Sequence, residues 1–512
     1  MDQHSKETRN GMCVELPICD RQAVTEVAFD FSLPDYQPEI KRLLRVRATV
    51  LPADKYIGTP NAELSGRIEY AIHYTGNDGA LYCSLQEGEY QITCPFEMPA
   101  EMDLNEGVLC DADTVCETVI ARVAAPRRIS VKCRLRSRVQ LLGSTTVETP
   151  TPVYDGTVER LCGSVMSLRR FVGVGDPMQL GDEILCDGQE GELRVISAEG
   201  DVFVSEAIAG SGVVNCRGEV CLKLICCREG EAALPTVQTR RIPFSQAVTV
   251  DGVEVNCDAC ADGVCSGLHV TVEEGRILCE MSVILRARAQ RNEEISYTRD
   301  LYSTCCECKT EYRDRRFLQG LRSLNGNFSL NHTAALSEVG LRPDVRVVDA
   351  CVTPSVTALE SEHGKYKLTG RCRCQLILFD GEEMSLQEIE APFRYECEGG
   401  EAVGDYDASV SAISCRARID GERVSVDAEL AVMLTTRKEE SLRTVFSASL
   451  GEEVKGSGAA YTVCYPARED TLWSVAKRYH RSIGAMMQVN HLAEAPSADS
   501  AESLAGVRYL LI

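Results

Sequence analysis

The chain has 512 residues, of which 44% are hydrophobic and 26% charged, enough for three or four domains with buried cores. Lys and Arg total 54 against 77 Asp and Glu, and this net charge of -23 argues against nucleic-acid binding, which depends on neutralising phosphates. No apolar run approaches the roughly 20 residues of a membrane-spanning helix, and the polar start predicts no signal peptide. We therefore expect a cytoplasmic protein whose 26 cysteines are mostly thiols.

Three segments of the chain share one layout, in which a glycine-led strand is followed by a Pro-Phe pair and then by a long alternating strand. The leading glycines Gly66, Gly218 and Gly370 are evenly spaced at 152 residues. The pairs are Pro95-Phe96, Pro243-Phe244 and Pro392-Phe393. The closing strands begin at Arg128, Arg276 and Arg423. A layout that recurs at a fixed spacing indicates tandem copies of one domain.

Apolar and polar residues alternate along each glycine-led strand, as in a strand with one buried face. The residues predicted to face a core are Ile68, Tyr70, Ile72, Tyr74, Val220, Leu222, Leu224, Cys226, Cys372, Cys374, Leu376 and Leu378. Cys133 and Cys279 of the closing strands are expected to face inward as well. The predicted fold is mainly β, with three tandem antiparallel repeats of sandwich or barrel type over residues 20–150, 160–310 and 320–450.

This combination of a glycine-led strand, a Pro-Phe pair and a closing strand resembles the SPOCS domain of spore-coat-associated proteins in endospore-forming bacteria. The second copy carries the clearest resemblance, in Arg217-Gly218-Glu219, Lys223-Leu224-Ile225, Pro243-Phe244-Ser245-Gln246 and Asp300-Leu301-Tyr302-Ser303. The resemblance covers roughly residues 20–450. Its motifs are structural, and they imply no catalytic group.

A different module follows the repeats. Residues 451–460 are small, polar and rich in glycine, which predicts a linker, and residues 461–512 predict strand, helix, helix and strand. Asp470 and Thr471 are expected to cap the first helix. Its buried face is expected to hold Leu472, Val475, Ala476 and Tyr479. The second helix, around Ser482–Asn490, is expected to bury Ile483, Met486 and Val489. The closing strand is expected at Val507–Ile512.

The segment Asp470–Tyr479 is similar to the Asp-Thr-Leu-x-x-Ile-Ala-x-x-Tyr block of LysM domains, and Asn490 stands where the family's second helix ends. The resemblance implies a small βααβ domain of a family that often binds glycans containing N-acetylglucosamine. This chain departs from the family at Glu469, which replaces a glycine, in three extra residues after Val463, and in a longer loop over 495–502. Because the family's glycan groove is formed by these two loops, the departures weigh against glycan binding and leave protein binding open.

We expect partner or ligand binding at the rim of this C-terminal module, by Asp470, Thr471, Trp473, Lys477 and Asn490. Trp473 is the sole tryptophan of the chain, and an exposed tryptophan is a strong interface anchor. The alternative is that Trp473 fills the core of the small module.

No catalytic, cofactor or metal site is expected. The seven histidines form no zinc-binding motif, and the sequence contains neither a nucleophile elbow nor a phosphate-binding loop. Cys257 and Cys260, with Cys265 and His269 nearby, have the residue types of a zinc site, but the other two copies have no equivalents. We interpret them as unligated thiols in a loop. An enzyme is therefore not predicted.

Two charged stripes suggest self-association. The outward face of the first closing strand carries Lys132, Arg134, Arg136 and Arg138. The matching face of the third closing strand carries Asp427 and Glu429. Faces of opposite charge on similar domains can join copies head to tail. The alternative is that both are ordinary solvated faces.

These features together predict a non-enzymatic morphogenetic scaffold or adaptor of the spore envelope, which acts in the mother-cell cytoplasm at the forespore surface. The resemblance implies a partner in the basement layer of the coat, such as its polymerising ATPase. A peptidoglycan-binding wall protein is the competing hypothesis, and a metal-stabilised protein is a third.

Overall fold

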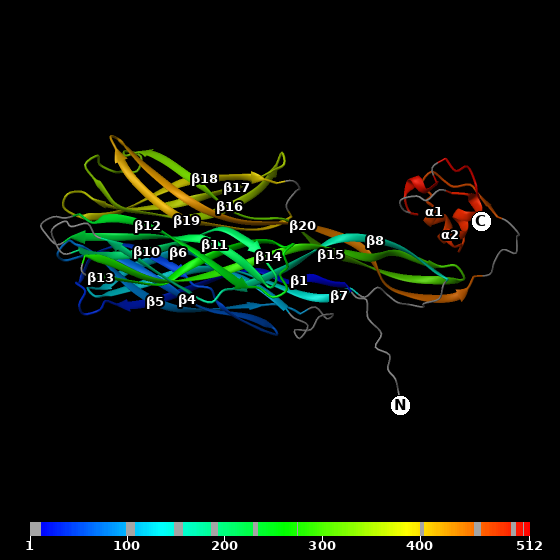
Figure 1. Ribbon diagram of the computed structural model, residues 1–512, viewed down its shortest axis with the longest axis horizontal. Helices are drawn as coiled ribbons and strands as arrows, with labels where there is room; N and C mark the ends of the chain where they lie inside the picture. Colours follow the sequence, from blue (N-terminus) through cyan, green and yellow to red (C-terminus); the bar gives the residue numbers. More distant parts are fainter. Residues whose placement is uncertain are drawn as a thin grey trace, which may run out of the picture.

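The computed structural model is mainly β, with 77% of residues in strands and 4% in helices (Figure 1), which confirms the predicted fold class at this level. The structure describes residues 12–98, 108–147, 157–185, 193–228, 234–273, 275–399, 404–454, 462–492, 498–504 and 506–512. Within these ranges no helix combines the length and the apolar character that crossing a bilayer requires.

The first sandwich consists of two antiparallel sheets. One has the order β1-β7-β6, with β1 (Met12–Ser32), β6 (Val108–Ala125) and β7 (Arg128–Val147). The other is built on the glycine-led strand, with β2 (Ile40–Val50), β3 (Asp54–Gly58), β4 (Asn61–Gly76) and β5 (Leu81–Pro95). In this second sheet β4 lies in the middle and pairs with each of the other three strands.

The second and third sandwiches have the same order of strands, apart from β9 of the second, which also pairs with β14. The second sandwich consists of the sheets β13-β14-β8 and β10-β11-β12, and the third consists of the sheets β15-β20-β19 and β16-β17-β18. The strands of the second are β8 (Val158–Val174), β9 (Met178–Leu185), β10 (Leu193–Ala209), β11 (Val213–Arg228), β12 (Thr236–Thr249), β13 (Asp258–Glu273) and β14 (Arg276–Ser303). Those of the third are β15 (Cys306–Ala335), β16 (Arg346–Glu362), β17 (Lys365–Phe379), β18 (Met384–Glu398), β19 (Asp405–Asp420) and β20 (Arg423–Glu453).

The strands of the three sandwiches, including the parts that extend beyond them, therefore span residues 12–147, 158–303 and 306–453, which differs from the expected limits. The third begins at Cys306 rather than near residue 320, because β15 is 30 residues long and runs well beyond the sandwich itself. Short segments thus separate the sandwiches, and much of the sequence expected to connect them is strand.

Each sandwich has its own apolar core, which is filled by every second side chain along its strands. The twelve residues of β4, β11 and β17 predicted to face inward are at most 1% exposed, which confirms the prediction. Cys133 and Cys279 face the cores of the first and second sandwiches, also as predicted. Cys260 and Cys265 are buried within β13, so the expectation that they lie in a loop is wrong.

The leading glycine of two copies is covered by an aromatic ring from the neighbouring strand. Gly218 lies opposite Phe244, and Gly370 lies opposite Phe393. A Cβ atom at Gly370 would come within 2.3 Å of both a ring carbon of Phe393 and the carbonyl oxygen of Ser355. Glycine in a strand interior often marks such a close approach, and the ring covers the backbone that glycine exposes.

The first copy differs from the layout that the sequence predicts. Its leading Gly66 lies opposite Tyr90, whereas Pro95 of the Pro-Phe pair lies opposite Asn61, five residues earlier in β4. The predicted equivalence of Pro95-Phe96 with the other two pairs is therefore wrong. Two dipeptides of the same composition can occupy different registers, and in the first copy Tyr90 supplies the ring.

Four long strands extend together beyond the sandwiches to the far end of the molecule (Figure 1). We call this extension the stalk, which consists of residues 158–165 of β8, 295–303 of β14, 306–318 of β15 and 439–453 of β20. In the stalk β8 pairs with β14, and β15 pairs with β20. The two ribbons pack through an apolar cluster of Val165, Ile295, Phe317, Tyr297 and Leu442.

A small module, which we call the cap, lies at the end of the stalk (Figure 1). It contains β21 (Val463–Cys464), α1 (Leu472–Arg478), α2 (Ile483–Asn490), a 3-10 turn (Ala501–Leu504) and β22 (Leu510–Leu511). β21 and β22 pair antiparallel. Thr471 caps α1 as predicted: its hydroxyl accepts from the amide of Ser474, whose own hydroxyl accepts from the amide of Thr471.

The cap differs from the prediction at two apolar positions. Tyr479 and Val489 are exposed instead of buried, since Tyr479 is the C-cap residue of α1 and Val489 lies in the last turn of the short α2. Residues 451–453 of the expected linker belong to β20, and 455–460 lie outside the described residues.

The three sandwiches meet through the faces of their sheets that turn away from the cores. The strand pairings place Arg45 opposite His73, Ser197 opposite Ile225 and Asp349 opposite Ile377. Arg45, Ser197 and Asp349 follow one another at 152 residues, and so do their neighbours Leu44, Ile196 and Val348. Leu44, Ile196 and Val348 pack in one cluster, so corresponding positions of the three sandwiches converge on one centre.

Candidate functional site

Trp473, expected at an exposed rim of the cap, lies in the contact between the cap and the tip of the stalk. Its side chain is buried, with the residue 5% exposed, and its ring packs edge-on against Tyr302 of β14 with the ring centroids 5.0 Å apart. The expectation of an exposed tryptophan is therefore wrong. Trp473 anchors an interface within the chain, because the tip of the stalk covers the ring.

Asp300 at the tip of β14 receives most of the polar contacts from the cap. Its Oδ2 accepts the indole N–H of Trp473 at 2.9 Å, and both of its oxygens lie 2.7 Å from Nζ of Lys477. The hydroxyl of Tyr312 in β15 donates to Oδ1 at 2.6 Å. Burial raises the pKa of the Asp300 carboxyl, but the donors Lys477, Tyr312 and Trp473 outweigh burial and hold its pKa below the ordinary value.

Further contacts surround this carboxylate. The hydroxyl of Tyr302 donates to the carbonyl oxygen of Arg481 at 2.7 Å, and Nδ1 of His480 donates to the carbonyl oxygen of Ser303 at 2.9 Å. Arg299 forms an ion pair with Asp499 at 2.6 Å. The cap is thus docked on the stalk by one aromatic pair and several polar contacts.

The other three predicted residues stabilise the cap itself. Asp470 accepts from the amide of Ala467 and pairs with Arg478, and Thr471 caps α1. Asn490 exchanges two hydrogen bonds with the backbone of Leu511, at 2.8 and 2.7 Å, and so ties α2 to β22. The structure therefore brings Trp473 and Lys477 together at Asp300, and it gives Asp470, Thr471 and Asn490 structural contacts inside the module.

Charged side chains from all three sandwiches are buried where the sandwiches meet. We call them the central ion cluster, which consists of Arg45, Arg47, His73, Glu199, Lys223 and Asp349. Arg45 is fully buried and pairs with Glu199 at 3.1 Å and with Asp349 at 2.7 Å. Lys223 lies 3.0 Å from Glu199 and 3.1 Å from Asp349. Arg47 also pairs with Glu199, so Glu199 has three cationic partners and Asp349 has two, which offsets the cost of removing the charges from water.

His73 of the cluster forms a pair with Ser197 that is sealed from solvent. Nε2 of His73 lies 3.0 Å from the hydroxyl of Ser197, and both residues are buried. Burial, reinforced by the positive charge of Arg45, lowers the pKa of His73 to about 3, so that the ring is neutral at physiological pH. A nucleophilic serine needs room for a substrate beside its hydroxyl, so we interpret this pair as structural.

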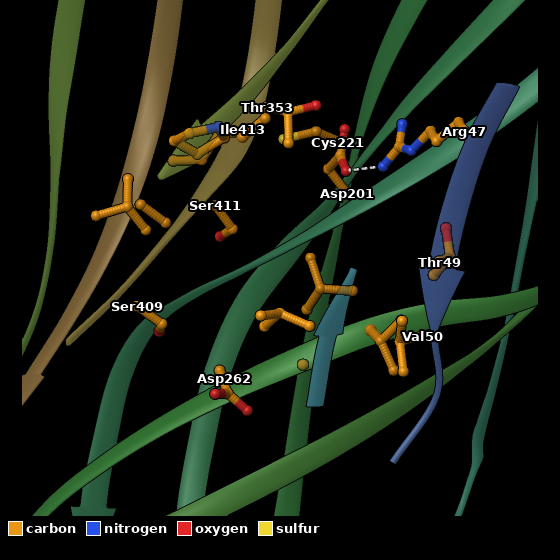
Figure 2. Close-up of a pocket in the computed structure, with 18 of the residues that line it drawn as sticks. Arg47, Thr49, Val50, Asp201, Cys221, Asp262, Thr353, Ser409, Ser411 and Ile413 are labelled. Atoms are coloured by element: carbon orange, nitrogen blue, oxygen red, sulfur yellow. Dashed lines mark hydrogen bonds and ion pairs between the residues drawn. The ribbon is translucent and has the colours of Figure 1, made fainter. Parts of the chain in front are cut away.

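A cavity of about 500 Å³ opens beside the cluster, between the edge strands of the three sandwiches (Figure 2). Side chains from β2, β10, β13, β16 and β19 line it. Figure 2 shows Thr49 and Val50 of the first sandwich facing Asp201 and Asp262 of the second and Thr353, Ser409, Ser411 and Ile413 of the third. Arg47 and Asp201 form an ion pair in its wall. In the described ranges no group of three or more His, Cys, Asp or Glu residues is placed to hold a metal ion.

The charged stripes make contacts inside the chain. Arg138 of β7 pairs with Asp405 and Asp407 of the third sandwich, and Glu429 of β20 pairs with Arg241 of the second. Arg134 and Arg136 both contact Glu117 on the neighbouring strand. Among the contacts of the described residues the two stripes do not pair with each other inside the chain, and head-to-tail association of separate copies stays a prediction. Opposite charges do join the sandwiches, but through other partners.

Sequence reasoning missed Asp300 as a functional residue and the whole central ion cluster. Asp300 lies in a segment whose only signal in the sequence is its resemblance to SPOCS domains. Arg45, Glu199 and Asp349 lie on polar strand faces, as many other charged residues do. A charged residue inside an alternating polar face gives no signal of its burial by another domain. Comparison of the chain with protein-family models, curated proteins and solved structures gives no match.

Proposed function

We propose that this chain is a non-enzymatic scaffold built from three copies of one sandwich unit and a cap that docks onto other macromolecules. The recurrent sheet order supports three copies, and so does the spacing of 152 residues that relates Leu44, Ile196 and Val348 at the common centre. The proposed units are the SPOCS-like repeats and the LysM-like cap that the sequence suggests.

The observation that carries the scaffold proposal is the pairing of buried charges across the three sandwiches. Arg45 joins all three, because it belongs to the first sandwich and its partners Glu199 and Asp349 belong to the second and third. Breaking a buried pair leaves an uncompensated charge, so such contacts fix domains in one arrangement. A rigid body with a cap at the end of a stalk is suited to hold a partner at a set distance.

The cap has an apolar surface that is free to contact a partner. Tyr465 and Tyr509 are 77% and 56% exposed, and they flank the paired residues Cys464 and Leu510 of β21 and β22. Val463 and Val489 of the same module are exposed as well. Exposed aromatic residues grouped on one small module indicate a protein interface, so we propose these tyrosines as anchors in place of the covered Trp473.

Together with the family resemblance, these features support a morphogenetic role in the spore envelope. The proposed place of action is the mother-cell cytoplasm at the forespore surface, and the proposed partner is a polymerising ATPase in the basement layer of the coat. Neither the buried Ser–His pair nor the cap supports catalysis, and so the proposal includes no reaction.

Localisation of a tagged chain in sporulating cells tests this proposal. We expect recruitment to the forespore surface that is lost in Tyr465→Ala/Tyr509→Ala and kept in Tyr36→Ala, a control that removes an equally exposed tyrosine from the first sandwich. A diffuse signal for the unmodified chain would contradict the proposal. Retention on purified peptidoglycan that requires residues 462–512 would support the wall-protein hypothesis instead.

A further inference from the structure

The cavity between the sandwiches is positively charged, although the chain as a whole carries a charge of -23. Eight basic residues line it: Arg47, Lys55, Lys223, Arg240, Arg241, Arg286, Arg373 and Arg416. The lining includes three acidic residues: Asp113, Asp201 and Asp262. An excess of basic groups in a concave site concentrates anions there.

All three acidic residues are occupied by basic neighbours. Asp201 pairs with Arg47, and Arg286 pairs with both Asp113 and Asp262. Lys223 belongs to the central ion cluster, and Arg241 pairs with Glu219 and Glu429. The carboxylates of the lining therefore do not neutralise the positive charge of several of its arginines.

Three arginines of the lining are not paired with a carboxylate. Across the residues that the structure describes, no carboxylate lies within ion-pair distance of Arg240, Arg373 or Arg416. Arg416 donates one hydrogen bond, to the hydroxyl of Thr239 at 3.2 Å. Nε of Arg373 is buried, and no acceptor among the described atoms receives its hydrogen bond. The guanidinium of Arg373 therefore keeps hydrogen-bonding capacity that the described residues do not use.

The fold brings Arg373 and Arg416 to one side of the cavity. Arg373 lies on β17 opposite Thr353 of β16. Arg240 of β12 is paired with Leu222 and shares the strand face of Ile242, which turns to the core of the second sandwich. Arg416 lies on β19, which also packs against β16, and its hydrogen bond to Thr239 ties it to β12. Hydroxyl groups of Thr353, Ser409 and Ser411 face the same space (Figure 2) and add donors.

We propose that this cavity binds a small organic oxyanion through Arg373 and Arg416. Guanidinium groups recognise carboxylates and phosphates by paired hydrogen bonds, and the two anions share this chemistry. A cavity of about 500 Å³ is of the size that small-molecule sites have, and it is too small for a folded partner. Because residues of all three sandwiches line it, a bound anion would link the sandwiches. This site is independent of the proposed role of the cap.

Isothermal titration of the full chain with citrate and, separately, with pyrophosphate tests the proposal. We expect one anion per chain, and the tighter probe identifies the site as a carboxylate or a phosphate site. Arg373→Gln/Arg416→Gln should weaken binding at least about tenfold, which corresponds to the loss of one charge-assisted hydrogen bond. The control is Arg394→Gln, which removes an exposed charge of the same sheet outside the cavity and should leave binding unchanged.

The thiols in the lining give a second measurement that needs no variant. Cys351 and Cys415 line the cavity, whereas Cys162 is exposed elsewhere. We expect the bound anion to slow alkylation of Cys351 and Cys415 and to leave the rate at Cys162 unchanged. The proposal is wrong if neither probe binds at millimolar concentration, if Arg394→Gln weakens binding as much as the double variant, or if alkylation of the two lining thiols is unaffected.

Discussion

The indole nitrogen of Trp473 in the cap donates a hydrogen bond to Asp300 of the stalk at 2.9 Å, and this contact joins residues 173 positions apart. Since Trp473 is the sole tryptophan of the chain, its fluorescence reports directly on whether the cap is docked. Asp300 also holds Lys477 and Tyr312, so the release of the cap should depend on this one carboxylate.

Asp300→Asn should weaken the docking of the cap. The amide keeps the shape of the side chain but loses the charge that Lys477 contacts at 2.7 Å, which should cost about 1–3 kcal/mol in docking free energy. We expect the emission of Trp473 to shift to longer wavelength and proteolysis between stalk and cap to accelerate. Asp314→Asn, an exposed stalk residue, is the matched control. An unchanged spectrum in Asp300→Asn would show that the aromatic contact with Tyr302 and the other polar contacts hold the cap without this carboxylate.

The docking of the cap should also depend on pH. The pKa of Asp300 is lowered when the cap is docked, so its contribution is fully present above the ordinary carboxyl pKa of about 3.9 and is lost as the pH falls through the lowered value. Titration of Trp473 emission from neutral pH downward should therefore show a transition only in acid, below about pH 4. Asp300→Asn should lack this transition. A midpoint above pH 5 would contradict the assignment of the transition to Asp300.

Removal of Arg45 should destabilise the junction of the three sandwiches. Arg45→Met leaves Glu199 and Asp349 buried with one fewer cation, and we expect a loss of about 3–5 kcal/mol in the free energy of unfolding in urea. Lys41→Met is the control, because Lys41 and Glu383 form an exposed pair between the first and third sandwiches that should contribute less than about 1 kcal/mol. Equal effects of the two substitutions would mean that the central ion cluster does not fix the arrangement.

Substitution of the leading glycines by alanine should distinguish a steric clash with backbone atoms from a clash with a side chain. A Cβ atom at Gly370 meets the carbonyl oxygen of Ser355 at 2.3 Å, whereas one at Gly66 meets only atoms of the Tyr90 side chain, at 2.7–2.8 Å. Gly370→Ala should therefore destabilise by about 1–3 kcal/mol, and Gly66→Ala by less, because a side chain can move. Thermal unfolding of the two variants gives the comparison. A larger effect at Gly66 would contradict this account.

The buried faces of the strands could be predicted from the sequence because they depend on local alternation. Ile68, Leu222 and Leu376 each stand in a run of period two, and a run of this kind needs only a sheet with one buried face. The mainly β fold and the N-cap at Thr471 follow from equally local signals. The register between strands depends on residues that are far apart in the sequence. The predicted equivalence of Pro95-Phe96 with the other two pairs was therefore wrong, although the dipeptide is the same as in the other two copies.

The contacts between sandwiches could not be predicted, since they join residues that the sequence places far apart. Arg45 and Glu199 are separated by 154 positions, and both lie on polar faces that alternation assigns to solvent. The same reasoning explains Trp473. The amphipathic pattern of α1 placed it off the buried stripe, and in the structure Tyr302 and Asp300 of the stalk contact its ring. Burial by another domain leaves no periodic signal in either partner.

The meeting of Arg45, Ser197 and Asp349 at one centre has a consequence for assembly. An oligomer of three identical chains would be obliged to set three identical side chains there, and three arginines or three aspartates would repel one another. In one polypeptide the three equivalent positions can carry different residues. They can therefore hold a cation, a hydroxyl group and an anion, each of which needs the others at the centre. A single sandwich expressed alone is thus not expected to rebuild the whole by trimerising.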